Sequence, residues 1–348
     1  MNIKSLTRRT ALAIATAGLF ASASASALFA QDYTTENPLK VVFVVPGNLG
    51  DKSFYDSAAA GLNRAAAELP ITLKIIETGE DQTSWQPALA DVSEGDYDVI
   101  ISGPWTITGF VAELAPQFPE KKYIIFDDAP DFAAVPLPNV IGVTYRTSTA
   151  GYLAGYAAAK LSKTGVLGEI LGMEIAPVLE IAVGFEQGAK AANPDVRVVR
   201  AVSDNFADPA KGKEIALAQM ADGADVIFPI AGGTGVGALQ AVRDAGKMAV
   251  GVDSDQAAIF EATDAAQAAV IFTSVEKKVG QSLYDVLSQT IAGTAPYGSA
   301  LTLGLAENAV GISKNAYYDA AVPAELRSEL DALEQKIISG EIKVDTAM

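Results

Sequence analysis

The sequence predicts an α/β protein made of two doubly wound parallel-sheet lobes. Apolar, β-branched runs such as 40–46 are typical of strands that are buried on both faces of a sheet. Helical patterns alternate with these runs along the chain, which predicts parallel sheets with helices on both faces. The strands are too numerous for one ordinary open sheet, so two similar lobes are the economical arrangement.

The expected elements begin after a polar lead-in at 31–38. In the first half, strands are expected at 40–46, 71–77, 97–102, 122–127 and 139–144, with helices at 53–69, 85–93 and 106–117. The second half repeats the alternation. Its strands are expected at 166–171, 196–202, 225–230, 248–252, 268–273 and 299–305, with helices at 150–162, 179–192, 209–221, 235–245, 277–291 and 323–339.

The composition excludes several classes of chemistry. The 348 residues include no Cys and no His, which excludes disulfides, thiolate nucleophiles, Ser-His-Asp triads and the usual zinc sites. Half of the residues are apolar, which is ample for a core. The net charge of −17 makes the chain a poor nucleic-acid binder. We therefore expect no nucleic-acid partner, no metal and no cofactor.

Residues 1–30 resemble a cleavable secretory signal peptide. Three basic residues precede an apolar stretch at 11–20, and small residues follow. Cleavage after Ala27 and after Ala30 both fit, and Arg8-Arg9 suits either a twin-arginine or an ordinary export signal. The remaining chain has 22 basic and 42 acidic residues, a net charge of −20. With no Cys for a lipid anchor, we expect a free periplasmic protein.

Ligands of such sheets bind at the carboxyl ends of the strands, so the loops there hold the candidate residues. In the first loop, Asp51 or Ser53 can cap the next helix, and Phe54 either packs in the core or presents its ring to a ligand. Trp105 follows Gly-Pro at the end of the third strand. It is placed to stack on a flat ligand, with core packing as the alternative.

Acidic residues and one lysine follow other strands. Asp127, Asp128 and Asp131 could bind hydroxyls or a cation, or lie in a solvated loop, and they lack EF-hand spacing. Asp253 lies at a strand tip, where a carboxylate can accept two sugar hydroxyls. Lys277 is expected in a first helical turn, an unfavourable position that contact with a ligand or with Asp253 would explain. Surface exposure is the alternative.

The glycine-rich segment 231–238 loosely matches a dinucleotide fingerprint, with Asp253 and Asp255 downstream. Gly-rich turns are common between strands and helices, and exported proteins seldom meet NAD. We favour a loop whose backbone approaches a ligand closely at Gly233.

Four segments in this order resemble the basic membrane protein family, the purine-nucleoside-receptor-like substrate-binding proteins of ABC transporters. They are 51–54 (DKSF), 208–216 (DPAKGKEIA), 231–235 (AGGTG) and 251–256 (GVDSDQ), and the resemblance runs from about residue 40 to about residue 287. It implies a type I periplasmic-binding-protein fold, in which two lobes joined by three hinge crossings close on a ligand, mostly a nucleoside in this family.

The resemblance also implies roles for five candidate residues. Phe54 would stack on the base, Asp127 would face the cleft, and Gly233 would contact the ligand through its backbone. Asp253 and Lys277 would hold the ribose hydroxyls. On our strand assignment these two lie in different lobes, so they would bridge the cleft and couple ligand binding to closure.

Some positions depart from the family pattern. Val45-Pro46 stands where the family has an Asp that selects the base, and Thr149 replaces a Glu. The family's second stacking Phe aligns with Ile181, so we expect Trp105 to supply the missing ring. The sugar-binding half is therefore better supported than a particular base.

The three crossings divide the chain between the lobes. The first lobe is expected to comprise 38–146 and 272–298, and the second 147–271 and 299–348, with crossings near Tyr145, Phe272 and Ser299.

The expected function is that of a monomeric periplasmic receptor that delivers a nucleoside-like ligand to an inner-membrane ABC permease. No chemical step is expected. The alternatives are a sugar-specific receptor, a receptor that serves a sensor protein, and an exported nucleosidase or glycosidase that uses Asp127, Asp128 and Asp253.

Overall fold

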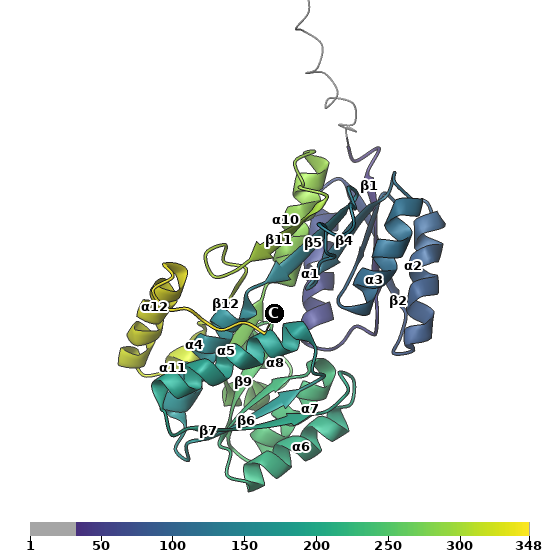
Figure 1. The fold of residues 1–348 in the computed structure, drawn as a ribbon. Helices are drawn as coiled ribbons and strands as arrows, with labels where there is room; N and C mark the ends of the chain where they lie inside the picture. The colour runs from purple at the N-terminus through teal and green to yellow at the C-terminus, as the bar shows by residue number, and fades with distance from the viewer. Residues whose placement is uncertain (1–32, 348) are drawn as a thin grey trace, which may run out of the picture.

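The computed structural model describes residues 33–347, so the predicted signal peptide lies outside the described residues. Two six-stranded sheets form two lobes with helices on their faces (Figure 1), which confirms the predicted α/β architecture. The strand order is β11-β5-β4-β3-β1-β2 in the first sheet and β12-β10-β9-β8-β6-β7 in the second. Every pairing is parallel except that of β12 with β10.

The first lobe is assembled mainly from the N-terminal part of the chain. Its strands are β1 (Leu39–Val45), β2 (Ile71–Glu77), β3 (Val99–Ser102), β4 (Lys122–Phe126), β5 (Val140–Tyr145) and β11 (Ser299–Leu303). Its helices are α1 (Phe54–Glu68), α2 (Trp85–Glu94), α3 (Thr106–Leu114) and α10 (Val279–Ile291), with short 3₁₀ turns at Gln82–Ser84 and Ala115–Gln117.

The second lobe contains the remaining elements. Its strands are β6 (Val166–Leu171), β7 (Arg197–Val202), β8 (Val226–Ile230), β9 (Met248–Asp253), β10 (Ile271–Lys277) and β12 (Val310–Ile312). Its helices are α4 (Thr147–Leu161), α5 (Ala176–Ala192), α6 (Pro209–Ala221), α7 (Gly232–Asp244), α8 (Gln256–Glu261), α9 (Ala265–Val270), α11 (Ala316–Ala321) and α12 (Ala324–Ile338).

Two strands lie in the opposite lobe from the one the sequence predicts. Residues 272–277 are expected in the first lobe, but β10 pairs with β9 in the second sheet. Residues 299–303 are expected in the second lobe, but β11 pairs with β5 in the first. The chain therefore crosses after Tyr145, after Lys277 and after Leu303, and the crossings predicted near Phe272 and Ser299 are wrong. A strand's own pattern does not encode which distant strand it joins.

Glycines allow two helices of the second lobe to pack closely. A Cβ on Gly155 of α4 would lie 2.0 Å from the carbonyl oxygen of Phe185 in α5, and one on Gly184 would lie 2.0 Å from that of Ser148. These distances are far below van der Waals contact, so only glycine permits this approach of the two backbones.

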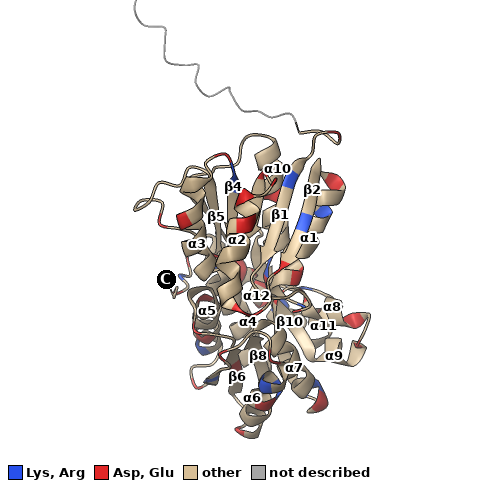
Figure 2. Cartoon of the chain, turned by 90° about the vertical axis from the view of Figure 1, so that its right-hand side faces the viewer, with Lys and Arg blue, Asp and Glu red and all other residues tan. Residues whose placement is uncertain are grey.

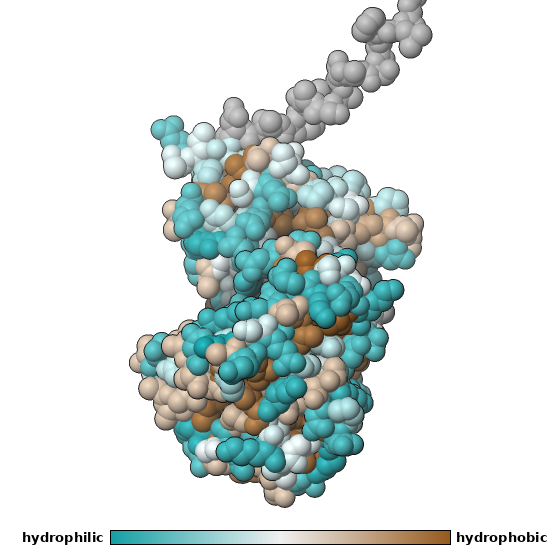
Figure 3. Space-filling view, turned by 90° about the vertical axis from the view of Figure 1, so that its left-hand side faces the viewer, coloured by the Kyte–Doolittle hydropathy of each residue, from teal (hydrophilic) through white to brown (hydrophobic). Residues whose placement is uncertain are grey.

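The face of the molecule that Figure 3 shows is mostly polar. Teal and white residues cover much of the face in Figure 3, and the apolar areas are small patches. Acidic residues are spread over both lobes (Figure 2), in keeping with the net charge of −17. None of the helices in residues 33–347 is long and apolar enough to cross a membrane.

Candidate functional site

A cavity of about 540 Å³ lies between the two lobes. Loops at the carboxyl ends of strands from both sheets line it, where the strand-end rule predicts a ligand site. The seven predicted residues that line it are Asp51, Phe54, Trp105, Asp127, Gly233, Asp253 and Lys277. The eighth, Ser53, is buried and contacts Asp253.

A buried lysine joins the two lobes at this cavity. Lys277, the last residue of β10, places Nζ 2.6 Å from Oδ2 of Asp127, which follows β4 in the first lobe. The same Nζ lies 3.6 Å from Oδ1 of Asp253 at the end of β9. Lys277 is therefore in the second lobe beside Asp253, and the predicted bridge between these two residues across the lobes is wrong. The bridge runs from Lys277 to Asp127.

The position of Lys277 also differs from the predicted helical turn. It ends a strand, and α10 begins at Val279, so an unfavourable helix dipole does not explain this lysine. Its neighbours do, because the side chain is 4% exposed and lies between two carboxylates. A buried ammonium group is stable only with such partners.

Burial and the neighbouring charges act in opposite directions on the ionisation of this group. Burial raises the pKa of Asp127 to about 6, against the opposing attraction of Lys277. Burial disfavours the charged form of Lys277, but the carboxylates of Asp127 and Asp253 outweigh it and raise the lysine pKa above its ordinary value. Lys277 is therefore charged at neutral pH, and it can donate to a hydroxyl while the carboxylates accept.

The two aspartates have the same unusual backbone conformation. Asp127 and Asp253 both have φ of 63°, in the left-handed region that non-glycine residues seldom adopt. Such conformations cost free energy and are typical of ligand sites, where the surrounding structure holds them. Here they occur at corresponding strand tips of the two lobes.

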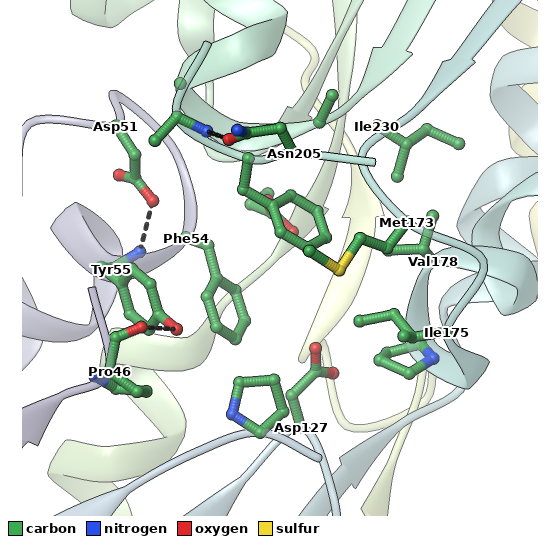
Figure 4. A pocket seen from close by; sticks show the side chains of 18 of the residues that line it. Pro46, Asp51, Phe54, Tyr55, Asp127, Met173, Ile175, Val178, Asn205 and Ile230 are labelled. Atoms are coloured by element: carbon green, nitrogen blue, oxygen red, sulfur yellow. Dashed lines mark hydrogen bonds between the residues drawn. The ribbon is translucent and has the colours of Figure 1, made fainter. Parts of the chain in front are cut away.

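An aromatic ring covers the lysine. Phe54 begins α1, and its ring centroid lies 4.9 Å from Nζ of Lys277, within cation–π range. The ring is partly exposed and packs against Phe126 at 5.3 Å and Tyr55 at 5.2 Å between centroids. Figure 4 shows that Phe54 projects into the pocket. Asp51 and Tyr55 lie on one side of its ring, and Met173 and Val178 lie on the other.

Asp51 holds the loop that precedes Phe54. Its carboxylate accepts hydrogen bonds from the backbone N–H groups of Ser53, Tyr55 and Asp56 at the start of α1. Burial raises the pKa of Asp51 to about 6, although these hydrogen bonds oppose the shift. Of the two predicted capping residues, Asp51 therefore performs this role, whereas the Ser53 side chain makes no capping bond.

Trp105 lies in the cavity wall, partly exposed, with φ of 47°. Its ring centroid is 6.1 Å from that of Trp85 in the same lobe and 6.2 Å from that of Phe206 in the other. Phe206 also lines the cavity, and the sequence interpretation missed it. The signal for it was its place in the loop after β7. Ile181 lines the cavity too, but Phe206 supplies a second-lobe ring.

Gly233 lies in the first turn of α7, beside the cavity. A Cβ there would be 3.1 Å from the carbonyl oxygen of Phe206, so glycine keeps the backbone accessible at a crowded position. The glycines of the dinucleotide-like pattern, Gly233 and Gly235, are inside the helix rather than in a phosphate-binding loop before it. This arrangement favours the predicted close-approach role over a dinucleotide site.

The rest of the wall contains both apolar and polar residues. The second lobe contributes Met173, Ile175, Val178 and Ile230, which face the pocket in Figure 4. Other lining residues that the sequence interpretation missed are Pro46, Tyr55, Glu80, Gln82, Asp204 and Asn205. Within residues 33–347 no group of His, Cys, Asp or Glu is arranged to hold a metal ion.

Comparison with known proteins gives one consistent family. The model of the family described as "ABC transporter substrate-binding protein PnrA-like" matches residues 39–347. Basic membrane protein A1 of Borrelia garinii subsp. bavariensis is 33% identical over 309 residues, which cover 88% of each chain. A CD4+ T-cell-stimulating antigen of Listeria innocua is 28% identical and covers 86% of this chain and 85% of its own length.

Solved structures agree with the fold. A solute-binding protein of an ABC transporter system from Aeropyrum pernix K1 superposes with a TM-score of 0.79 at 27% identity, over 89% of this chain and 94% of that one. One from Conexibacter woesei DSM 14684 gives a TM-score of 0.71 at 25% identity, over 88% and 99%. The fold is thus that of the type I periplasmic binding proteins, as the sequence predicts.

Proposed function

Because the chain belongs to the family of PnrA-like ABC transporter substrate-binding proteins, we propose that it captures a nucleoside between its two lobes and delivers it to an ABC importer. The nucleoside would be of the purine type. Capture takes place in the periplasm, after removal of the predicted signal peptide, and the receptor acts as a monomer.

One observation supports the ligand class more than any other. Lys277, Asp127 and Asp253 form a charged, buried group directly beside the exposed part of the Phe54 ring. Vicinal ribose hydroxyls need a donor and acceptors side by side, which this group provides. A base attached to the same ribose would lie near the Phe54 ring, which projects into the pocket (Figure 4).

Two further aromatic rings in the cavity wall support a ligand that carries a flat base. Trp105 and Phe206 belong to different lobes, so a base held near both would draw the lobes together. Pro46 and apolar side chains of the second lobe line the same cavity. Shape and stacking would therefore select the base here more than hydrogen bonds to its edge.

The site also supports binding without a chemical step. A glycosidase needs one carboxyl group free to donate a proton and another free to attack or to activate water. Asp127 and Asp253 instead share one lysine, and Ser53 donates a hydrogen bond to Asp253. Incubation with inosine should return the nucleoside intact, and release of hypoxanthine would contradict this proposal.

The most direct test is to identify the ligand. The protein, purified without denaturation, should carry a nucleoside that mass spectrometry detects. Titration calorimetry with inosine, guanosine, adenosine, uridine and free ribose should then show tightest binding for a purine nucleoside. Tight binding of free ribose or arabinose with no binding of nucleosides would favour the sugar-receptor alternative.

A further inference from the structure

A set of hydrogen bonds outside the ligand cavity joins one short segment of each lobe. The first-lobe segment is Lys52-Ser53, just before α1, and the second-lobe segment is 252–256, at the end of β9 and the start of α8. Four bonds connect them: Ser53 Oγ to Asp253 Oδ2 at 2.7 Å, Ser53 Oγ to the Val252 oxygen at 3.2 Å, Ser254 Oγ to the Ser53 oxygen at 3.1 Å, and Gln256 Nε2 to the Lys52 oxygen at 3.1 Å.

The second-lobe half of this contact is held rigidly. Gln256 is 1% exposed, and its Oε1 accepts a hydrogen bond from the backbone N–H of Val252 at 3.0 Å. Its own backbone N–H donates to Ser274 Oγ at 3.1 Å. The amide group of Gln256 is therefore fixed inside its own lobe, and its Nε2 is already directed at the first lobe. Little side-chain entropy is lost when the bond to Lys52 forms.

Ser254 and Gln256 do not line the ligand cavity, but each first-lobe partner adjoins a residue that does. Lys52 follows Asp51 and Ser53 precedes Phe54, and both Asp51 and Phe54 line the cavity. Their donors and acceptors belong to different lobes, so an opening movement that separates the two segments would break them. The bonds would then stabilise the closed arrangement alone.

We infer that Ser254 and Gln256 are positioning residues that shift the equilibrium between the open and closed receptor. Through this equilibrium they set the affinity for the ligand, although they do not touch it. A bond made only in the closed state raises the closed population. It therefore lowers the apparent dissociation constant of every ligand by the same factor. Residues that touch the ligand change affinity differently from one ligand to another. The effect on affinity rests on the proposed function, whereas the effect on closure does not.

The test uses Ser254→Ala, which removes one interlobe bond, with Gln256→Ala as a second variant. The matched control is Ser102→Ala, since Ser102 Oγ donates to the Val44 oxygen at 2.8 Å within the first lobe. Ser254→Ala and Gln256→Ala should each weaken the binding of inosine, guanosine and adenosine by the same factor, about fivefold, chiefly through faster dissociation. The control should leave the dissociation constants unchanged, although it lowers the melting temperature.

Closure itself can be measured without any ligand. The sequence has no Cys, so Asp91→Cys on α2 and Ala218→Cys on α6 give two defined spin-label sites, one exposed position in each lobe. Both helices begin at the cavity, at Trp85 and Pro209, so their separation reports opening. Double electron–electron resonance should show longer distances for Ser254→Ala and Gln256→Ala than for the Ser102→Ala control.

The outcomes separate the two proposals. If the distance distribution is unchanged in both Ser254→Ala and Gln256→Ala, the inference is overturned. It is also overturned if the losses of affinity differ from one nucleoside to another. If no nucleoside binds the unmutated protein, the proposed function fails, and the spin-label distances still decide whether these residues control closure.

Discussion

Nζ of Lys277 lies 2.6 Å from Oδ2 of Asp127, and this buried ion pair joins a strand end of the second lobe to a strand end of the first. Each lobe by itself would leave one of these charges without its partner. The pair is therefore complete only where the lobes meet, beside the ring of Phe54 and the carboxylate of Asp253. A ligand hydroxyl placed there meets a donor and acceptors in one position.

Replacement of Lys277 by Met tests this group. The variant keeps much of the side-chain volume but loses the donor and leaves two buried carboxylates unpaired, so nucleoside affinity should fall by about 100-fold. Lys278→Met is the control, because Lys278 directs its Nζ to Asn308 and does not line the cavity. Calorimetric titration of both variants measures the effect, and equal affinities would show that Lys277 does not hold the ligand.

Trp105 should contribute through its ring. Trp105→Ala removes a stacking surface between Trp85 and Phe206 and should weaken binding by about tenfold. Trp105→Phe keeps an aromatic face and should recover most of the loss. Tryptophan fluorescence would be altered by the substitution itself, so the titration should use calorimetry. Unchanged affinity in Trp105→Ala would refute the role.

Helix packing in the second lobe gives a prediction about stability. Gly155→Ala places a methyl group 2.0 Å from the Phe185 carbonyl oxygen, so α4 and α5 must separate, at a cost of about 1–3 kcal/mol or more. Gly109→Ala in α3 meets nothing within 4 Å and should raise stability by about 0.5–1 kcal/mol. Urea unfolding measures both. Similar effects of the two substitutions would contradict the close packing of α4 on α5.

Glu169 predicts a pH dependence. Burial raises its pKa from 4.5 to about 7, although the guanidinium of Arg200, 2.7 Å away, opposes the shift. The folded state therefore holds this proton more tightly than the unfolded state does. The resulting stabilisation is complete below about pH 4.5 and is lost as the pH rises through about 7.

Glu169→Gln removes that titration. The melting temperature of the variant should fall less steeply between pH 4.5 and pH 7 than that of the unmutated protein, both recorded by calorimetry at constant ionic strength. The comparison uses the difference between the two curves, because other carboxylates titrate in both proteins. Parallel curves over this range would mean that Glu169 is ionised in the fold as readily as in the unfolded chain.

The sequence predicts the α/β alternation, the two lobes and the strand-end location of the cavity, because these follow from local periodicity. It does not predict that β10 and β11 join the sheets they do, since strand pairing depends on contacts between distant segments. The prediction that Lys277 lies in the first turn of a helix is wrong for the same reason. The sequence pattern of residues 271–277 fits a segment leading into a helix as well as it fits a strand. Phe206 is missed because an aromatic residue in a loop belongs to no periodic pattern.

The exchanged positions of β10 and β11 have a consequence for how the protein is made. The first lobe obtains α10 and its edge strand β11 only from residues 279–303, after all the parallel strands of the second lobe. As the chain emerges from the ribosome, the face of α1 where Gly61 meets Gly280 stays uncovered until that point. Neither lobe therefore completes its fold before residue 299, since the first lobe still needs β11 and the second still needs β12, α11 and α12. A fragment that ends before residue 279 exposes an apolar helix face to solvent.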